Sequence, residues 1–155
     1  MITFSSLRKP VLFLFVAVFC FTSCSKELQN AVNGTGTSPT LEQYFEANVL
    51  NQNFIINLAT NNGVDITAQY SGYTFKMLKT DYYHGPTEIK KGATAYAGTW
   101  SSNSDYSKLV QTLPGTPPEF AFLNREWRFT KKNLSQLELA PWGTTEPLVL
   151  HMVKQ

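Results

Sequence analysis

Histidine, the side chain best suited to proton transfer near neutral pH, occurs only twice in this 155-residue chain. His84 follows Asp81 in a run of Asp-Tyr-Tyr-His-Gly-Pro, where it is either an acid–base partner or metal ligand, or, as we favour, a polar turn residue. His151 alternates with Leu150 and Met152, which is typical of the solvent face of a strand. A zinc site needs three or four converging ligands, so we predict no metal site.

Other catalytic patterns are equally sparse. The sequence has no nucleophile elbow, P-loop or dinucleotide fingerprint. Asp65 and Glu88 are of the type that glycosidases use in pairs, but nothing in the sequence brings them together. Arg125 and Arg128 flank Trp127, as in a platform on which bases stack, although outward arginines on a strand are the interpretation we favour. We therefore expect no catalytic residues, no cofactor and no enzyme.

The charge balance argues against a nucleic-acid partner. The chain has 13 Lys+Arg against 11 Asp+Glu, for a net charge of +2. Arg8 and Lys9 lie in an N-terminal targeting segment, and without them the count is 13 − 2 = 11 against 11. Proteins that bind nucleic acid normally carry a surplus of basic residues, so we expect no nucleic-acid binding.

The N-terminus has the layout of a secretory signal. Arg8 and Lys9 precede an apolar run of 11 residues, 11–21, which is shorter than the roughly 20 residues of a membrane-spanning helix. Residues 21–24 (Phe-Thr-Ser-Cys) then resemble the lipobox of bacterial lipoproteins, in which a peptidase cuts before a lipid-carrying cysteine. The resemblance implies a signal peptide over 1–23 and lipid attachment, such as palmitate, at Cys24. An ordinary cleaved signal with an incidental cysteine is the alternative.

Residues 24–27 (Cys-Ser-Lys-Glu) resemble the start of lipoproteins of the Bacteroidota type. This resemblance implies a membrane partner through the lipid on Cys24. Ser25, in place of the Asp that retains lipoproteins at the inner membrane of enteric bacteria, favours the outer membrane and leaves the periplasmic or surface face open. Cys20 and Cys24 are the only cysteines, so no disulfide is expected beyond them.

Composition divides the rest of the chain in two. Residues 24–39 are rich in Asn, Gly, Thr and Ser, and we predict a flexible tether, which as a coil of 15 residues from Ser25 to Pro39 spans roughly 20 Å. Residues 40–155 are long enough to bury a single core.

The pattern over 40–155 predicts one short helix followed by strands. Thr40 and Gln43 match a capping box, and Leu41 and Phe45 begin an apolar stripe, which together indicate a helix at about 41–50. Short segments with alternating apolar residues follow, separated by turn residues. The predicted strands are 54–58, 66–70, 73–77, 87–91, 93–100, 106–113, 120–129, 137–139 and 148–152; the predicted turns include 61–63, 81–86, 131–133 and 141–147, with a bulge or turn at 124–126. Eight or nine such strands favour a mainly β fold, an antiparallel meander that forms a barrel or a flattened barrel or sandwich.

The second half is similar to the small lipocalin-like domains of many Bacteroidota lipoproteins. The residues that carry the similarity are Gly98-Thr99-Trp100, the strand 106–113, Phe122-Leu123-Asn124 followed by Trp127, Leu137-Glu138-Leu139 and the final strand 148–154. The similarity implies a small lipocalin-like β-barrel. The Gly-x-Trp motif of true lipocalins lies on the first strand, and no Trp precedes Trp100, so closure of the barrel and a ligand cavity stay open.

Aromatic residues carry the remaining functional signal. They either fill the core or line the mouth of a site for a small apolar or sugar-like ligand. We predict that any such ligand-binding site uses Trp100 and Trp127 from the interior with Tyr83 and Trp142 from loops. The predicted function is a non-catalytic binding module on a membrane-anchored extracytoplasmic lipoprotein. The alternative is an accessory lipoprotein that acts through a protein partner in the cell envelope and displays an exposed apolar patch.

Overall fold

The computed structural model describes residues 40–132 and 135–155. The predicted signal peptide (1–23), the lipid attachment at Cys24 and the tether (24–39) lie outside the described residues. In the part that is described, no helix is long and apolar enough to cross a membrane.

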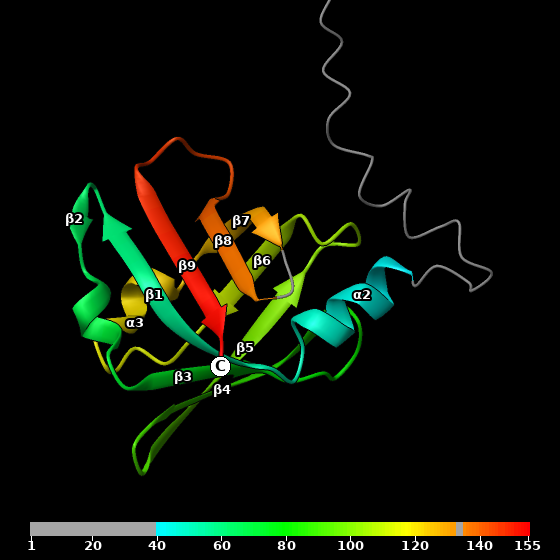
Figure 1. Ribbon diagram of the computed structural model, residues 1–155, viewed down its shortest axis with the longest axis horizontal. Coiled ribbons are helices and arrows are strands. Elements are labelled where there is room, and N and C mark those ends of the chain that lie inside the picture. Colours follow the sequence, from blue (N-terminus) through cyan, green and yellow to red (C-terminus); the bar gives the residue numbers. More distant parts are fainter. Residues whose placement is uncertain (1–39, 133–134) are drawn as a thin grey trace, which may run out of the picture. The chain divides into compact units, whose positions relative to one another are not determined.

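The fold is mainly β, as predicted, with a single antiparallel sheet that closes on itself (Figure 1). The strands are β1 (Asn53–Asn61), β2 (Val64–Asp65), β3 (Tyr73–Met77), β4 (His84–Lys91), β5 (Thr94–Ser102), β6 (Lys108–Thr112), β7 (Glu126–Lys132), β8 (Gln136–Pro141) and β9 (Leu148–Lys154). The helices are α2 (Leu41–Asn48), the 3₁₀ turn η1 (Thr67–Tyr70) and α3 (Phe120–Leu123). The strand order β2-β1-β3-β4-β5-β6-β7-β8-β9, with β1 also pairing with β9, makes an eight-stranded up-and-down barrel to which β2 adds a short extension.

The closure of the barrel depends on the pairing of β1 with β9. That pairing extends from Phe54 opposite Lys154 to Asn61 opposite Leu148. On its other side β1 pairs with β3 only through Asn53 and Phe54. Beyond Phe54 the two strands therefore diverge, and η1 rather than β3 contacts β1 there.

Helix α2 begins at the predicted capping box. The Thr40 hydroxyl accepts from the Gln43 backbone N–H at 3.3 Å, and the Gln43 side chain accepts from the Thr40 backbone N–H at 2.9 Å. Phe45 and Val49 bury the inner side of the helix, whereas Leu41 is 44% exposed. The stripe predicted from Leu41 is thus wrong at its first position, because the first turn of α2 extends past the barrel core.

Regular alternation predicts three strands well. Tyr73, Phe75 and Met77 all point into the barrel from β3. The predicted inward residues of β8 and β9 are buried too; they are Leu137, Leu139, Leu148, Leu150 and Met152. One buried face and one solvent face fix the register of such strands, since a slip of one residue would invert them.

Alternation misleads in the segment before β3. The pattern over residues 66–70 predicts a strand, but Thr67–Tyr70 form η1, which follows the two-residue β2. The Thr67 backbone N–H donates to the Asp65 carboxylate at 2.8 Å, and the Thr67 hydroxyl accepts from the Ala59 backbone N–H at 2.9 Å. The register of β1 also shifts between Ile56 and Leu58, which places Ala59 rather than Leu58 in the core.

Three further boundaries differ from the prediction. Residues 120–123 form α3 rather than the start of a strand, and β7 begins only at Glu126. Strand β4 begins at His84, so the second half of the predicted 81–86 turn belongs to the sheet. Lys131 and Lys132 belong to β7, and Asn133 of the predicted turn lies outside the described residues.

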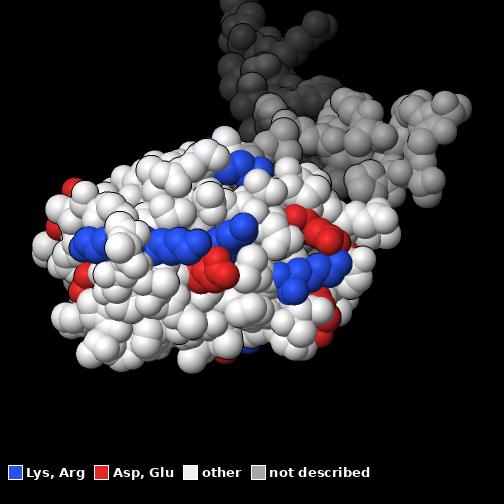
Figure 2. Space-filling model, turned by 90° about the horizontal axis from the view of Figure 1, so that it is seen from below, with Lys and Arg blue, Asp and Glu red and all other residues white. Residues whose placement is uncertain are grey.

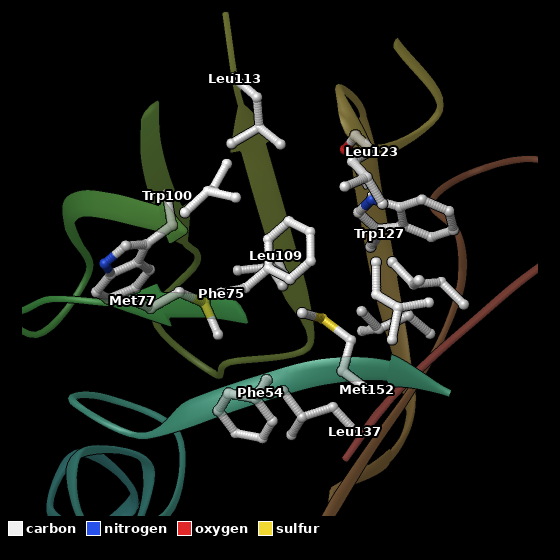
Figure 3. Packing of buried hydrophobic residues seen from close by; sticks show 14 of the residues in the cluster. Phe54, Phe75, Met77, Trp100, Leu109, Leu113, Leu123, Trp127, Leu137 and Met152 are labelled. Atoms are coloured by element: carbon white, nitrogen blue, oxygen red, sulfur yellow. Dashed lines mark hydrogen bonds between the residues drawn. The ribbon is translucent and has the colours of Figure 1, made fainter. Parts of the chain in front are cut away.

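The interior is packed with aromatic and aliphatic side chains (Figure 3). Trp100, Trp127 and Leu137 point inward from different strands and meet residues of β3 and β9 in the middle of the barrel. Thr87 is the one buried polar side chain among the described residues, and its hydroxyl donates to the Gln111 side-chain oxygen at 3.3 Å. The barrel thus has a continuous hydrophobic core with a single polar pair inside it.

The outer face of β3 and β4 carries charges of both signs. Lys76 lies opposite Glu88 across the two strands. Figure 2, which shows this face from below, places acidic side chains among the lysines and arginines rather than a continuous basic surface.

Candidate ligand-binding site

The meander gives the barrel two ends with different connections. One end, here the helix end, carries α2, the β3–β4 loop (78–83) and the β5–β6 loop (103–107). The other, the plug end, carries β2, η1, the 113–125 connection with α3, and the β8–β9 loop (142–147). Successive antiparallel strands reverse direction, so loops separated by an odd number of strands lie at opposite ends.

Two of the four predicted ligand-binding residues belong to the packed core. Trp100 is 1% exposed, and its indole N–H donates to the Leu78 backbone oxygen at 2.6 Å. Trp127 is fully buried, and its indole N–H donates to the Leu123 backbone oxygen at 3.1 Å. Both rings therefore bury their apolar area within the domain, and each indole N–H has a hydrogen-bond acceptor there.

The barrel interior holds almost no free space. The internal cavity has a volume of about 10 Å³. Its lining is mainly aliphatic, namely Phe75, Leu109, Gln111, Leu113, Leu123, Leu139, Leu150 and Met152. Pockets for small molecules have volumes of about 300–1,000 Å³, so in this conformation the interior is a core and any ligand has to bind outside it.

The other two predicted residues lie at opposite ends of the barrel. Tyr83 belongs to the helix end, where its hydroxyl donates to the Glu42 carboxylate at 3.2 Å, an interaction that raises the pKa of Tyr83. Trp142 belongs to the plug end, where its backbone N–H donates to the Glu126 backbone oxygen at 3.0 Å. The half-buried Trp142 ring has the Lys108 ammonium 5.4 Å from its centre. The four predicted residues thus do not converge on one site.

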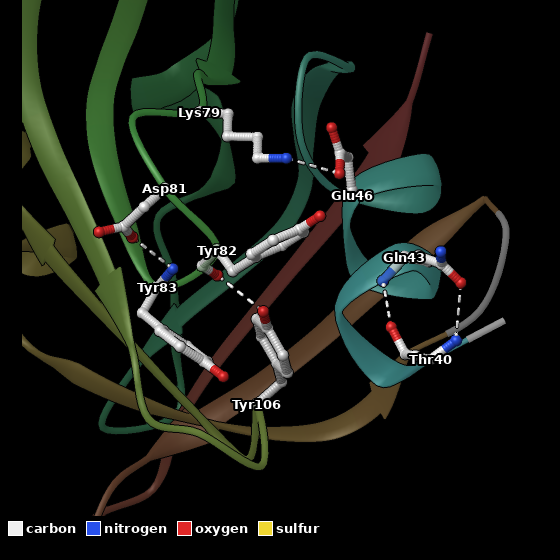
Figure 4. A network of polar contacts seen from close by, with 8 residues as sticks. All are labelled: Thr40, Gln43, Glu46, Lys79, Asp81, Tyr82, Tyr83 and Tyr106. Atoms are coloured by element: carbon white, nitrogen blue, oxygen red, sulfur yellow. Dashed lines mark hydrogen bonds and ion pairs between the residues drawn. The ribbon is translucent and has the colours of Figure 1, made fainter.

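Tyr83 is part of an ordered aromatic stack (Figure 4). Its ring lies 5.6 Å from that of Tyr106, which in turn lies 4.3 Å from that of Phe45 in α2. The Tyr106 hydroxyl donates to the Tyr82 backbone oxygen at 2.8 Å, and burial raises the pKa of Tyr106 to about 12. The β3–β4 loop is therefore held against the barrel through a neutral, buried tyrosine.

A groove outside the barrel lies at the plug end. It has a volume of about 300 Å³ and lies between η1 and α3; we name it the α3 groove. Its lining consists of Asn61, Ile66, Gln69, Pro118, Glu119, Ala121, Phe122 and Arg125. The apolar side chains of Ile66, which precedes η1, and of Ala121 and Phe122 in α3 line the groove with two amides and two groups of opposite charge. This combination is suited to a small hydroxylated molecule.

Glu119 is held in the α3 groove by two buried tyrosines. Its carboxylate accepts from the Tyr73 hydroxyl at 2.8 Å, and its backbone oxygen accepts from the Tyr70 hydroxyl at 2.8 Å. Burial raises the pKa of both tyrosines well above the ordinary value, and the hydrogen bond to Glu119 adds to this for Tyr73. Both hydroxyls therefore remain donors, so that Tyr73 orients the carboxylate and Tyr70 holds the backbone of Glu119 before any ligand arrives.

Arg125 is held on the other side of α3. Its Nε donates to the Phe122 backbone oxygen at 2.7 Å, and its guanidinium lies 5.1 Å from the centre of the Phe122 ring and 5.4 Å from that of Trp127. A guanidinium has five N–H donors, and the Glu146 carboxylate lies 3.7 Å from one terminal nitrogen. The group is thus positioned by its neighbours while it keeps donors for a ligand.

Sequence reasoning missed this groove. Arg125 was expected to face outward on a strand beside Trp127, but it precedes β7 and holds the C-terminal end of α3. Glu119 carried no signal because its tyrosine partners lie more than 40 positions earlier in the chain, at separations of 46 and 49 residues. The one local signal is the Phe-Ala-Phe-Leu run after Pro117 and Pro118, which is too short to distinguish a helical turn from a strand.

The residues considered for acid–base chemistry lie on the surface. His84 Nδ1 is 2.9 Å from an Asp81 carboxylate oxygen, with 58% and 49% of the two side chains exposed. Asp65 and Glu88 lie on β2 and β4, which do not pair. Over residues 40–132 and 135–155, no cluster of three His, Cys, Asp or Glu side chains is suited to a metal ion.

The strand order and closure define this domain as an antiparallel, up-and-down barrel of eight strands. No family model matches the chain, and no curated protein matches it. The chain is similar to japanin from Rhipicephalus appendiculatus, a structure solved with bound cholesterol. That alignment has a TM-score of 0.49 and 6% identity and covers 70% of this chain and 77% of the other. The fold assignment rests on the sheet of this chain itself.

Proposed function

We propose that this protein is a lipid-anchored protein of the bacterial cell envelope whose barrel binds a small, sugar-like ligand in the α3 groove. It acts as a non-catalytic binding module. The observation that carries this proposal is the oriented pair of Glu119 and Arg125 beside the apolar side chains of the α3 groove, outside a barrel whose internal cavity has a volume of only about 10 Å³.

The donors and acceptors of the α3 groove favour a hydroxylated ligand. The carboxylate of Glu119 accepts hydrogen bonds, the guanidinium of Arg125 donates them, and the exposed amides of Asn61 and Gln69 do both. A sugar presents hydroxyls that donate and accept, together with apolar C–H faces that can pack on Ile66. A purely apolar ligand would leave the two charged groups desolvated without partners, which is costly.

Anchoring is the second element of the proposal. Cys24 directly follows a short apolar run and small residues, the pattern that supports lipid attachment. More than one acyl chain is needed for stable attachment, and bacterial lipoproteins of this type carry several on the cysteine. The outer membrane is the proposed location, and a lipoprotein of the Bacteroidota type the proposed class.

The ligand proposal is tested with the intact lipoprotein in detergent, screened against a panel of neutral mono- and oligosaccharides by NMR. Because a hydrogen bond to a charged group contributes about 1.5–3 kcal/mol, Glu119→Gln is expected to weaken binding by about tenfold or more. Glu88→Gln, on the outer face of β4, is the matched control and should bind normally. Equal binding by both variants would contradict a site at Glu119.

Failure of every saccharide to bind would reject the proposed function and favour the accessory role through a protein partner. Anchoring is tested separately. Cys24→Ala is expected to accumulate as an uncleaved precursor or to be released in soluble form, as judged by fractionation and mass spectrometry. A mature, acylated Cys24→Ala protein in the membrane fraction would disprove lipidation at this residue.

A further inference from the structure

Three of the four large hydrophobic side chains that are exposed in the described chain belong to elements of the helix end. Leu41 in α2 is 44% exposed, and Tyr82 and Tyr83 in the β3–β4 loop are 39% and 38% exposed. We name these three residues the tyrosine patch. Tyr83 joins the two elements through its hydrogen bond to Glu42, the residue after Leu41. The other large hydrophobic residue that is exposed in the described chain, Val64, lies at the plug end with 63% exposure.

The loop that carries the tyrosine patch is firmly held. The Asp81 carboxylate accepts from the backbone N–H groups of Tyr83 and His84 at 2.7 and 2.9 Å. Tyr106 holds the loop from beneath by stacking on Tyr83 and bonding to the Tyr82 backbone (Figure 4). A surface that is ordered before it meets a partner loses little conformational entropy on binding.

The chain segment that would carry the membrane anchor joins the described domain next to the tyrosine patch. The chain from Cys24 reaches the barrel at Thr40, the N-cap of α2, and Leu41 is the next residue. If the intervening 15 residues, Ser25 to Pro39, form the flexible coil that the sequence predicts, they would span roughly 20 Å. A lipid on Cys24 would therefore keep the tyrosine patch at a high local concentration near the bilayer.

We propose that the tyrosine patch is a membrane-docking surface that inserts into the headgroup layer of the bilayer to which Cys24 is anchored. This inference rests on the proposed lipidation. Tyrosine rings favour the membrane–water interface, because the apolar ring and the polar hydroxyl are both accommodated there, and Leu41 adds an aliphatic side chain.

The charges around the patch favour an uncharged lipid surface. Three acidic residues, Glu42, Glu46 and Asp81, belong to α2 and the β3–β4 loop together with one basic residue, Lys79. The Lys79 ammonium lies 2.7 Å from Glu46 and 3.9 Å from the centre of the Tyr82 ring. Because these residues include no surplus of basic groups, the tyrosine patch has no net electrostatic attraction to anionic lipids. Docking is therefore expected on zwitterionic lipid and to depend little on salt, since the driving force is the transfer of apolar area.

The cysteine content of the chain allows a direct test. Cys20 lies in the predicted signal peptide and Cys24 would carry the lipid, so an introduced cysteine would be the one free thiol of the mature lipoprotein. We would prepare Tyr82→Cys, Leu41→Cys and, as the matched control from the opposite end, Val64→Cys. Each would be labelled with an environment-sensitive fluorophore and reconstituted into phosphatidylcholine–phosphatidylethanolamine vesicles containing a spin-labelled lipid.

The docking proposal predicts blue-shifted emission and strong quenching by the spin-labelled lipid at positions 82 and 41, and neither effect at position 64. Equal emission and quenching at all three positions on anchored protein would overturn docking while leaving lipidation intact. Protein that fails to remain with the vesicles would overturn both. A label at position 82 that is water-exposed on vesicles but shielded in intact cells would overturn membrane docking in favour of a protein partner.

Discussion

Trp100 and Trp142 show how differently the same residue type is used in this molecule. Trp100 is enclosed by the barrel and bonded to the Leu78 carbonyl. Trp142 is half-buried at the plug end, with the Lys108 ammonium 5.4 Å from the centre of its ring. The two indoles should therefore respond very differently to truncation.

We expect Trp100→Ala to lower the free energy of unfolding by about 3–5 kcal/mol, because it removes a buried aromatic ring and leaves a cavity. Trp142→Ala should leave it nearly unchanged. Thermal and denaturant unfolding of the two variants measures the difference. An equal fall in stability for both would place Trp142 in the core.

At the scale of whole elements, strand β4 passes unusually close to the β3–β4 loop. A Cβ on Gly85 would lie 2.0 Å from the Leu78 backbone oxygen, the same oxygen that accepts from Trp100. Only glycine lets the strand and the loop approach this closely. The contact fixes the loop that leads into the tyrosine patch.

We expect Gly85→Ala to destabilise the domain by about 1–3 kcal/mol, the usual cost of an overpacked side chain. Gly115→Ala is the control, since a Cβ there meets no atom within 4 Å and its φ is not positive. Denaturant unfolding of both variants provides the comparison. Similar free energies of unfolding for the two variants would show that β4 can move away from the β3–β4 loop without loss of stability.

A sequence pattern predicts an element correctly when the burial of one face of that element dictates the pattern. Tyr73, Phe75 and Met77 alternate because β3 has one buried face, and this strand was predicted correctly. Ile66, Ala68 and Tyr70 alternate in the same way but belong to η1 with its flanking residue, which is held by contacts to β1 that no local pattern reveals. Of these three residues only Tyr70 is buried, so alternation of residue types in a short segment specifies neither burial nor the backbone conformation.

The candidate site was less predictable than the fold for a topological reason. Five strands, β4 to β8, separate the loop of Tyr83 from that of Trp142, and an odd number places them at opposite ends. The α3 groove joins η1 to α3 across a long stretch of chain, so Glu119 has no local signal. Residue type identified the aromatics, but only the closed barrel shows which side chains share a site.

The whole molecule presents its two proposed surfaces at opposite ends. The tyrosine patch lies at the helix end and the α3 groove at the plug end. If the patch faces the bilayer, the groove opens on the side away from it. A ligand then reaches the groove from the aqueous phase without displacing the domain from the membrane.

Acid should weaken this domain. The folded structure lowers the pKa of Asp81 through the Tyr83 backbone N–H, of Asp65 through Thr67, and of Glu42 through its backbone N–H at the start of α2. A lowered folded-state pKa means that the unfolded chain takes up protons first as the pH falls. The stabilisation is thus complete above the ordinary value of 4.5 for Glu42 and is lost below it.

We expect the melting temperature to be nearly constant from pH 7 to about pH 5 and to fall below about pH 4. Calorimetry across this range tests the expectation, and Asp81→Asn should reduce the dependence because it removes one titrating group. A melting temperature that rises on acidification would contradict the sign of all three shifts.

The pairing of β1 with β9 also determines when the fold can exist. The partners of Phe54 and Asn61 are Lys154 and Leu148, so the barrel cannot close until β9 has been made. Until then the edge of β1 that pairs with β9 stays open, whereas β2 and β3 are already available to its other edge. An open strand edge can pair with other molecules. Contacts between such distant parts of a chain form slowly. A nascent chain of this protein therefore passes through an interval in which β1 to β8 exist without the closed barrel.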